Sequence, residues 1–215
     1  MEEVRNVHKR DIILTSIIIL LPILLGIILW DRLPDRIATH FDADNVPNGW
    51  NSKVFTVFGI PCALLLMHVL YFIILLNNSK KPNVSRKVSG LMMWIMPVIS
   101  VVTNNIILLK AIGKDIDIGM IANLLCGILF IAVGNYLPKC RRNYLMGIRT
   151  PWTLANEDVW NKTHRLAGWC YLLIGICFLI NAFYTFGIII LAVLVVCVIL
   201  PCLYSFVLYK NKDKF

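Results

Sequence analysis

Two short polar stretches hold the side chains of this sequence whose types and spacing could do chemistry. In the first, His40, Asp42 and Asp44 alternate, so an extended strand would place all three on one side, as a metal site would need. The spacing fits neither an EF-hand nor a zinc motif, and Asp commonly forms backbone hydrogen bonds in turns. We therefore predict a turn-rich loop without a metal, whose three polar residues are candidate contacts for a partner.

The second stretch carries Glu157, Asp158 and His164 close together on a predicted helix, and such groups can act in general acid-base catalysis. The two acidic residues, however, lie off the helix face that carries Trp160 and His164, or only at its edge. No activated nucleophile or metal motif accompanies them. A membrane enzyme acting on lipid or peptide is the least favoured class, and we predict neither catalytic residues nor a cofactor.

These residues belong to a polar segment, residues 134–168, that we call the signature segment. Pro138 cannot continue the apolar helix before it, and Gly147 allows a backbone turn that a residue with a Cβ would resist. Residues 138–152 are therefore predicted to form an ordered loop. A helix then starts, with Thr153 as its N-cap and acidic residues near its first turn.

One face of this predicted helix is suited to close packing. At helical spacing the face holds Trp160, Thr163, His164, Ala167 and Gly168. The glycine would let another helix come close, as small residues do between membrane helices. This face continues directly into the next apolar segment.

The amino-acid composition indicates that this is a membrane protein. A hydrophobic share of 59% with 15% charged residues and a mean hydropathy of +0.75 lies outside the range of soluble domains. We predict an all-α, polytopic membrane protein of about six helices, with no room for a separate soluble domain. The predicted spans are about 12–30, 54–76, 88–109, 118–137, 166–183 and 186–209.

The positive-inside rule predicts the orientation. The N-terminal segment, the second loop, the signature segment and the C-terminal tail together hold 16 Lys/Arg, and the loops on the opposite side hold five. Both termini and loop 138–165 are therefore predicted to be cytoplasmic, in a multi-pass protein of the cell membrane. The net charge of +9 then reflects topology and attraction to anionic head groups of the lipid bilayer. We expect no direct nucleic-acid binding.

Few polar side chains lie inside the predicted spans. His68, Asn104 and Asn105 could line a cavity, but single Asn and His side chains more often bridge neighbouring helices. A small-solute or peptide transporter usually needs ionisable groups at membrane depth and often inverted repeats. The sequence shows neither, so a transporter or exporter is the second choice among the functional classes.

The seven cysteines are predicted to be reduced. Six fall within or at the edges of apolar spans, and there is no CxxC pair or disulfide framework. Cys140, beside Arg141 and Arg142, could be somewhat activated, but a structural role is favoured.

Many residues of the signature segment together resemble a known family. They are Gly134, Asn135, Pro138, Lys139, Arg142, Asn143, the run Gly-Ile-Arg-Thr-Pro-Trp-Thr-Leu at 147–154, Trp160, Thr163 and His164. This pattern resembles the signature of the SdpI-like family, bacterial membrane proteins named after the immunity protein against the sporulation-delaying peptide toxin. Loop 31–53 is similar to a domain of unknown function that often precedes the signature. It departs at Asn45, where a Gly is expected, although Asn also adopts the left-handed conformation.

The resemblance implies an immunity protein that protects the producing cell from a membrane-active peptide toxin. It also implies that the protein can signal toxin arrival by capturing a small cytoplasmic transcriptional repressor at the membrane. The corresponding regions would be 1–87, with two helices and the external loop 31–53, and 88–215, with four helices and the cytoplasmic loop 138–165.

The same resemblance supplies the candidate binding residues for a partner or toxin. They are Asn135, Arg142, Asn143, Arg149, Thr150, Trp152, Trp160, Thr163 and His164, together with His40, Asp42 and Asp44 of the external loop. Each has a structural alternative. Arg149 and Asn143 could satisfy loop carbonyls, the tryptophans could anchor at the membrane interface, and His164 could form hydrogen bonds within the loop.

Overall fold

The structure is a computed structural model that describes residues 2–42, 44–77, 86–144, 146–184 and 187–212. Within these ranges six helices are long and apolar enough to cross a membrane. They are Arg10–Ile28, Phe55–Ile74, Val88–Ala111, Ile118–Lys139, Glu157–Asn181 and Ile189–Lys210. The predicted class, a helical membrane protein with about six spans, is confirmed. The predicted turn around Thr185 and Phe186 lies outside the described residues.

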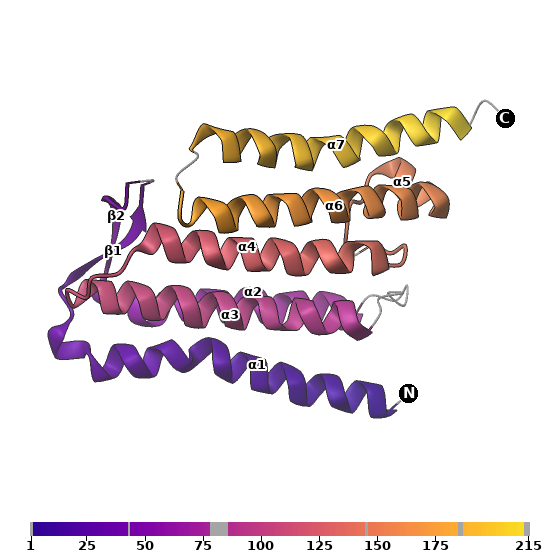
Figure 1. Ribbon diagram of the computed structural model, residues 1–215. Helices are drawn as coiled ribbons and strands as arrows, with labels where there is room; N and C mark the ends of the chain where they lie inside the picture. The colour runs from indigo at the N-terminus through magenta and orange to yellow at the C-terminus, as the bar shows by residue number, and fades with distance from the viewer. Residues whose placement is uncertain (1, 43, 78–85, 145, 185–186, 213–215) are drawn as a thin grey trace. The chain divides into compact units, whose positions relative to one another are not determined.

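The chain divides into two compact units. Figure 1 labels the helices and strands that they contain. Unit 1 comprises residues 1–77 and 92–122, and unit 2 comprises residues 78–91 and 123–215. Two helices, α3 (Arg86–Ala111) and α4 (Ile118–Tyr136), each contribute residues to both units. The predicted division of the chain after residue 87 stays a prediction.

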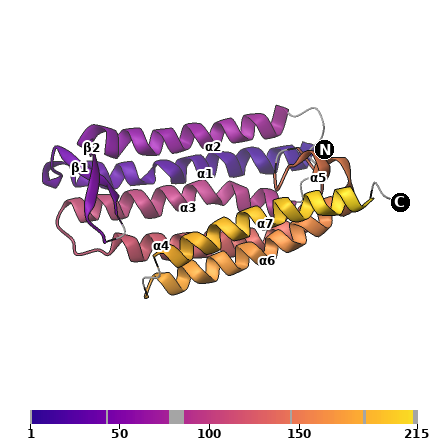
Figure 2. The same ribbon diagram turned by 90° about the horizontal axis from the view of Figure 1, so that it is seen from above.

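Unit 1 packs α1 (Glu2–Ile28) against a second helix that begins with a π-helical turn, Phe55–Gly59, and continues as α2 (Ile60–Asn77). Figure 2 shows α1 and α2 running side by side. A Cβ on Gly26 of α1 would lie only 2.5 Å from a methyl carbon of Val57. The absence of a side chain at Gly26 is therefore what lets these two helices approach.

Buried polar side chains link the helices of unit 1. The Thr15 hydroxyl on α1 is 2.9 Å from Nε2 of His68 on α2. The Ser100 hydroxyl on α3 donates to the Ile19 carbonyl of α1 at 2.7 Å. His68 thus bridges two helices as predicted, whereas the amide of Asn104 donates to the Ser100 carbonyl of its own helix, at 2.8 Å. These polar side chains stabilise helix packing.

Part of the predicted turn-rich loop is regular. After a 3₁₀ turn at Trp30–Arg32, strands β1 (Arg36–Phe41) and β2 (Pro47–Ser52) pair antiparallel, with irregular register around His40. Asn45 in the connecting turn has a φ of 61°, the left-handed conformation expected of it. The loop is therefore a β-hairpin, because it is long enough for two strands to pair their backbone groups.

Unit 2 contains its part of α4, a 3₁₀ turn at Leu137–Lys139, α5 (Pro151–Ala155), α6 (Glu157–Asn181) and α7 (Ile188–Lys212). The helix α6 begins at Glu157, shortly after the start that we predicted from Thr153, and it runs without a break into the apolar span predicted from about residue 166. No proline interrupts this segment, so its polar first turns and its apolar remainder form one helix. The ordered loop ends at Thr150, where α5 begins, and Asn156 separates α5 from α6.

Glycines set the distance between α4 and α6. A Cβ on Gly134 would lie 2.9 Å from the Gly168 carbonyl oxygen, and a Cβ on Gly168 would lie 2.9 Å from the Gly134 carbonyl oxygen. Gly127 and Gly175 form an equivalent pair, with corresponding distances of 3.0 and 2.8 Å. The predicted close approach at Gly168 is thus one of two contacts, seven residues apart on each helix, where the backbones meet directly.

Candidate functional site

Two N-caps shape the signature segment, and neither is the predicted Thr153. The Thr150 side chain caps the short helix α5, with Pro151 at the first helical position, and forms a reciprocal capping box with Thr153. Asn156 caps α6, accepting hydrogen bonds from the Asp158 and Val159 amides at 2.9 and 3.2 Å. The prediction for Thr153 was wrong because its hydroxyl lies inside α5, where it donates to the Ile148 carbonyl at 2.8 Å.

Trp160 and His164 form the buried centre of the signature segment. The two rings stack with centroids 4.0 Å apart and an interplanar angle of 19°. Trp160, 0% exposed, donates its indole N–H to the Cys140 carbonyl at 2.7 Å. The pair therefore joins the first turns of α6 to the loop that follows α4.

His164 holds the far end of the same loop. Its Nδ1 lies 2.9 Å from the Trp160 carbonyl oxygen, and its Nε2 lies 3.0 Å from the Ile148 amide nitrogen. A Cβ on Gly147, whose φ is +93°, would overlap this Nε2. Glycine is therefore required at 147 both for the turn and for the contact with the ring.

The side chain of Asn143 forms hydrogen bonds with backbone groups on both sides of it in the first half of the loop. Its amide donates to the Arg141 carbonyl at 2.7 Å, and its Oδ1 accepts the Met146 amide N–H at 2.8 Å. The thiol of Cys140 lies 3.4 Å from the same amide. Burial raises the pKa of the Cys140 thiol, although the Asn143 hydrogen bond opposes this rise. Cys140 is therefore an inert, structural thiol, the role that the sequence favoured.

The two arginines proposed as binding residues donate to backbone carbonyls. Arg142 Nη1 donates to the Leu154 and Ala155 carbonyls at 3.2 and 3.3 Å, at the end of α5. Arg149 Nη1 donates to the Tyr144 carbonyl at 2.7 Å. Both arginines are exposed, so they stabilise the loop while they remain accessible to solvent.

Trp152 connects α5 to the last helix. Its indole N–H donates to the hydroxyl of Ser205 in α7, and its ring meets Phe206 edge to face, with centroids 5.3 Å apart. Ser205 is fully buried and its hydroxyl donates to the Cys202 carbonyl at 2.6 Å. The signature segment therefore reaches all three long helices of unit 2.

Two predicted residues lie apart from this network. Asn135 is exposed and accepts a hydrogen bond from Lys139 at 3.2 Å, within one turn of chain. Thr163 is buried on α6, and within the described residues its hydroxyl has no hydrogen-bond partner. Thr163 thus fills space beside Trp160 and His164 on the predicted face, along with Ala167 and Gly168.

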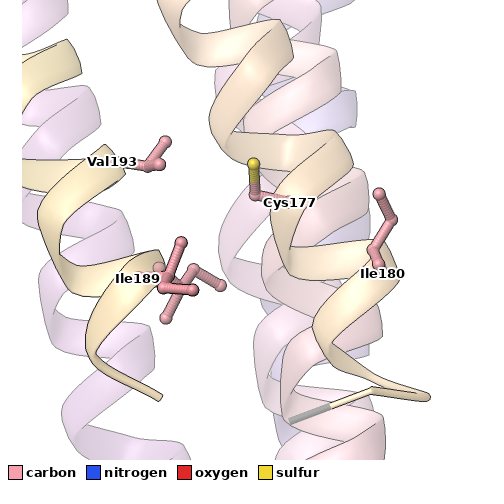
Figure 3. Close-up of a pocket in the computed structure, with 5 residues that line it drawn as sticks. Cys177, Ile180, Ile189 and Val193 are labelled. Atoms are coloured by element: carbon pink, nitrogen blue, oxygen red, sulfur yellow. The ribbon is translucent and has the colours of Figure 1, made fainter. Parts of the chain in front are cut away.

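An apolar cavity of about 240 Å³ lies between the end of α6 and the start of α7 (Figure 3). Its lining residues are Cys177, Ile180, Ile189, Ile190 and Val193. None of them carries a charge or a strong hydrogen-bonding group, so the cavity offers nothing that would orient a reacting substrate.

The hairpin residues of unit 1 serve the hairpin itself. Asp42 Oδ1 accepts the Asp44 and Val46 amide N–H groups at 3.0 and 2.9 Å, and His40 Nδ1 pairs with Asn48 Oδ1. These contacts close the turn, as expected for Asp in a turn-rich loop. Within the described residues no group of three possible ligands could hold a metal ion.

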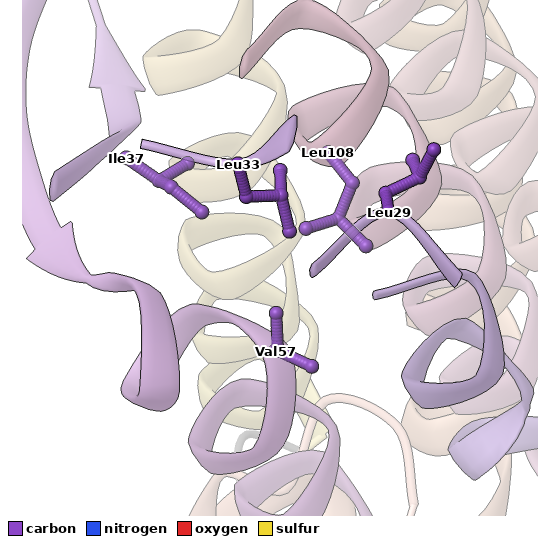
Figure 4. Close-up of a cluster of buried hydrophobic side chains, with 5 residues drawn as sticks. All are labelled: Leu29, Leu33, Ile37, Val57 and Leu108. Atoms are coloured by element: carbon purple, nitrogen blue, oxygen red, sulfur yellow. The ribbon is translucent and has the colours of Figure 1, made fainter. Parts of the chain in front are cut away.

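The hairpin is fastened to the helices of unit 1 at two places. Beneath it, Leu29, Leu33, Ile37, Val57 and Leu108 form a buried apolar cluster (Figure 4). At its turn, Asn45 donates to Asp117 at 2.7 Å and accepts the Gly119 amide N–H at 2.6 Å. The turn is thereby tied to the N-terminus of α4.

Sequence reasoning missed the distant partners of the predicted residues. Ser205, the Cys140 carbonyl and the Gly127–Gly175 pair were not singled out. Two signals were available: Ser205 is the one Ser or Thr in its apolar span, and the glycines recur at seven-residue spacing. Neither signal tells which residue on another helix is the partner.

Comparison with known proteins agrees with these observations. Residues 139–205 match the SdpI/YfhL protein family, and residues 17–65 match a domain of unknown function, DUF1648. The chain is 30% identical over 208 residues to the immunity protein SdpI of Bacillus subtilis (strain 168), covering 95% of this chain and 98% of the relative. This chain belongs to the SdpI family. No solved structure matches it.

The first and last residues of the SdpI family match coincide with structural features. It begins at Lys139, at the end of α4's 3₁₀ extension, and ends at Ser205, the partner of Trp152. The match therefore includes the loop, α5, α6 and the part of α7 that the signature segment contacts. The family resemblance stated from the residues is confirmed.

Proposed function

We propose that this chain is a membrane immunity protein that protects its cell from a secreted peptide toxin. The observation that carries the proposal is the similarity to the immunity protein SdpI over nearly the full length of both chains. Similarity on this scale includes all six apolar helices and both matched regions, so it supports a shared activity of the whole molecule.

The geometry of the signature segment supports a role without catalysis. The hydrogen-bonding groups of Asn143, His164 and Trp160 point at backbone atoms of the same segment, and Trp152 points at Ser205. Side chains that form these hydrogen bonds fix the relative positions of the helices and the loop of this segment. Within the described residues, these contacts leave none of these four side chains free to act as an acid or a base.

Survival of a toxin-sensitive bacterium tests the immunity proposal. Cells expressing the wild-type chain or the exposed-site control Lys162→Gln should survive the peptide toxin of a related producer. Cells expressing Trp160→Ala should die, because the loop loses its attachment to α6. Membrane abundance of each protein is measured by immunoblot. Failure of the wild type against every such peptide would reject the proposal.

We further propose that the protein reports toxin arrival by holding a small cytoplasmic repressor at the membrane. The exposed rim of the loop, Arg141, Tyr144 and Arg149, supports this: Tyr144 is 57% exposed, and aromatic and Arg side chains are frequent anchors of protein interfaces. In this proposal the rim contacts the repressor, and the buried residues only hold the rim in place.

A reporter of the induced promoter separates these two roles. Tyr144→Ala should abolish induction by toxin while protection persists, because this change alters the rim and leaves the Trp160–His164 contacts intact. Trp160→Ala should abolish both. Induction that persists in Tyr144→Ala and in Arg141→Ala would exclude the rim as the repressor surface.

A further inference from the structure

One row of side chains on α6 is exposed and chemically mixed. Asn161, Arg165 and Trp169 follow each other at intervals of four residues, so they lie along the same side of the helix. All three are exposed, whereas Trp160, His164 and Gly168 on the other side are buried. This row therefore points away from the helices that α6 packs against.

The guanidinium of Arg165 in this row is exposed to solvent. Within the part of the chain that the structure describes, it forms no hydrogen bond and no ion pair. The other cations of the signature segment do form such contacts: Arg142 and Arg149 donate to carbonyls, and Lys162 pairs with Asp158 at 3.2 Å. A guanidinium stays charged and offers five donors, so Arg165 is available to an external anion.

Trp169 marks where the row enters the hydrocarbon. It is 68% exposed, and beyond it the exposed residues on the same side of α6 are apolar: Leu173, Ile176 and Ile180. Tryptophan is enriched at the membrane–water interface, where its ring lies at head-group level. Arg165 is one helical turn further out, about 6 Å along the axis, which is the level of lipid phosphates.

We propose that Arg165, flanked by Asn161 and Trp169, binds the phosphate of an anionic phospholipid. The acyl chains of this lipid lie along Leu173 and Ile176. Charge favours an anionic lipid over a zwitterionic one, because residues 139–165 hold six Lys/Arg and two acidic residues. A guanidinium binds phosphate through two parallel hydrogen bonds, and the Asn161 amide supplies a further donor. The site depends neither on the immunity proposal nor on the orientation of the chain.

A thermal-shift titration of the full chain in detergent tests this site. Dioleoyl phosphatidylglycerol should raise the unfolding temperature of the wild type, because a ligand that binds the native state stabilises it. Arg165→Gln should raise the half-saturating lipid concentration about tenfold, the loss expected for one hydrogen-bonded charge. Arg36→Gln, which removes an equally exposed cation from the hairpin, should bind lipid like the wild type.

Two ligand controls identify what is recognised. Dioleoyl phosphatidylcholine should give a much smaller shift, and glycerol 3-phosphate, which lacks acyl chains, should give none. Equal titrations of Arg165→Gln and Arg36→Gln, no shift in the wild type, or equal shifts with the two lipids would overturn the proposal. A full shift with glycerol 3-phosphate would replace the lipid by a soluble anion and would also overturn it.

Fluorescence quenching gives an independent measurement. Phosphatidylglycerol with brominated acyl chains should quench the fluorescence of the wild-type protein, and Trp169→Phe should remove a quenched component. Trp50→Phe, which removes an exposed tryptophan of the hairpin, is the matched control. Identical loss of quenched signal in both variants would contradict a lipid held beside Trp169.

Discussion

His164 forms two hydrogen bonds within the signature segment, and their geometry determines which ring nitrogen carries the proton. The Ile148 amide can only donate, so Nε2 must accept, and the proton is on Nδ1, facing the Trp160 carbonyl. A doubly protonated ring would direct an N–H at another N–H. His164, the histidine of this segment and a possible acid or base, is therefore held neutral and has a structural role.

Replacing this ring tests its structural role. His164→Phe keeps an aromatic ring beside Trp160 but leaves the half-buried Ile148 amide without its acceptor. We expect a loss of about 1 kcal/mol of unfolding free energy, the net contribution of a typical hydrogen bond. The loop should also loosen, so that Cys140, 6% exposed in the wild type, is alkylated faster.

Denaturant unfolding and peptide-level mass spectrometry of maleimide-treated protein measure these two effects. The exposed Lys162→Gln serves as the control and should change neither. Wild-type stability of His164→Phe would mean that water replaces the ring nitrogen, and the structural role would be withdrawn.

The helices α4 and α6 meet backbone to backbone at two points, beside ring contacts of Phe130 with Tyr171 and Phe178. The pairs Gly134–Gly168 and Gly127–Gly175 bring the two backbones into direct contact. Membrane helices gain no hydrophobic driving force against each other, so close van der Waals packing of this kind has to hold them together. The loop of the signature segment begins at one end of this contact, where the Pro138 ring packs against Gly168.

A single methyl group should disturb this packing. In Gly168→Ala the Cβ would lie 2.7 Å from a Pro138 ring carbon and 2.9 Å from a backbone oxygen, so the helices must move apart. We expect a destabilisation of about 1–3 kcal/mol, typical of overpacking. In the matched Gly90→Ala the Cβ meets nothing within 4 Å, so stability should stay equal or rise. Thermal unfolding in detergent compares the two, and equal behaviour would refute the backbone contact.

The hairpin of unit 1 depends on an ionised carboxylate. The Met120 amide N–H donates to Asp117 and holds the pKa of this carboxyl below its ordinary value of 3.8, with further lowering from Asn45. A lowered folded-state pKa means that the contact stabilises fully above the unfolded pKa. That stabilisation is lost as the pH falls through the lower folded value.

Hydrogen exchange can follow this loss at the hairpin turn. After correction for intrinsic rates, the Met120 and Gly119 amides should be protected at pH 7 and lose protection as the pH falls through the lowered pKa of Asp117. Asp117→Asn cannot ionise, so its protection should not change over this pH range. A wild type whose protection shows the same pH dependence as that of Asp117→Asn would show that the carboxylate charge is not needed.

At the scale of the whole molecule, charge and helix number predict one topology. Six spans place the two termini on the same side, and the excess of Lys/Arg in the termini and the signature segment predicts that this side is the cytoplasm. The burial of Cys140 changes how this can be tested. A thiol that is 6% exposed would react poorly on either side of the membrane, so it is not a reporter of topology.

Introduced cysteines at exposed positions give the test. A membrane-impermeant maleimide should label Asn48→Cys on the hairpin in intact cells, because the hairpin is predicted to be extracellular. Asn161→Cys on α6 should react only after permeabilisation. Labelling is read at the level of the modified peptide, and reaction of Asn161→Cys in intact cells would reverse the predicted orientation.

The sequence by itself determined the class of this protein and much of its local structure. Hydropathy alone locates six spans, because hydrocarbon must be crossed by uninterrupted apolar helices. Helical spacing alone identified the face of Trp160, Thr163 and His164 that is buried. The left-handed Asn45 was expected from the family resemblance, which places a Gly at this position. These features depend on residues close together in the chain.

Only the tertiary structure decided what each polar residue binds. That Trp152 meets Ser205, that His164 accepts the Ile148 amide and that Asn45 meets Asp117 depends on segments separated by 16 to 72 residues. The N-cap of α6 is Asn156 instead of Thr153 for a local reason, because the Thr153 hydroxyl already bonds Thr150 and Ile148. Local patterns fix which side chains are polar and which face they share, whereas their partners follow from how the helices pack.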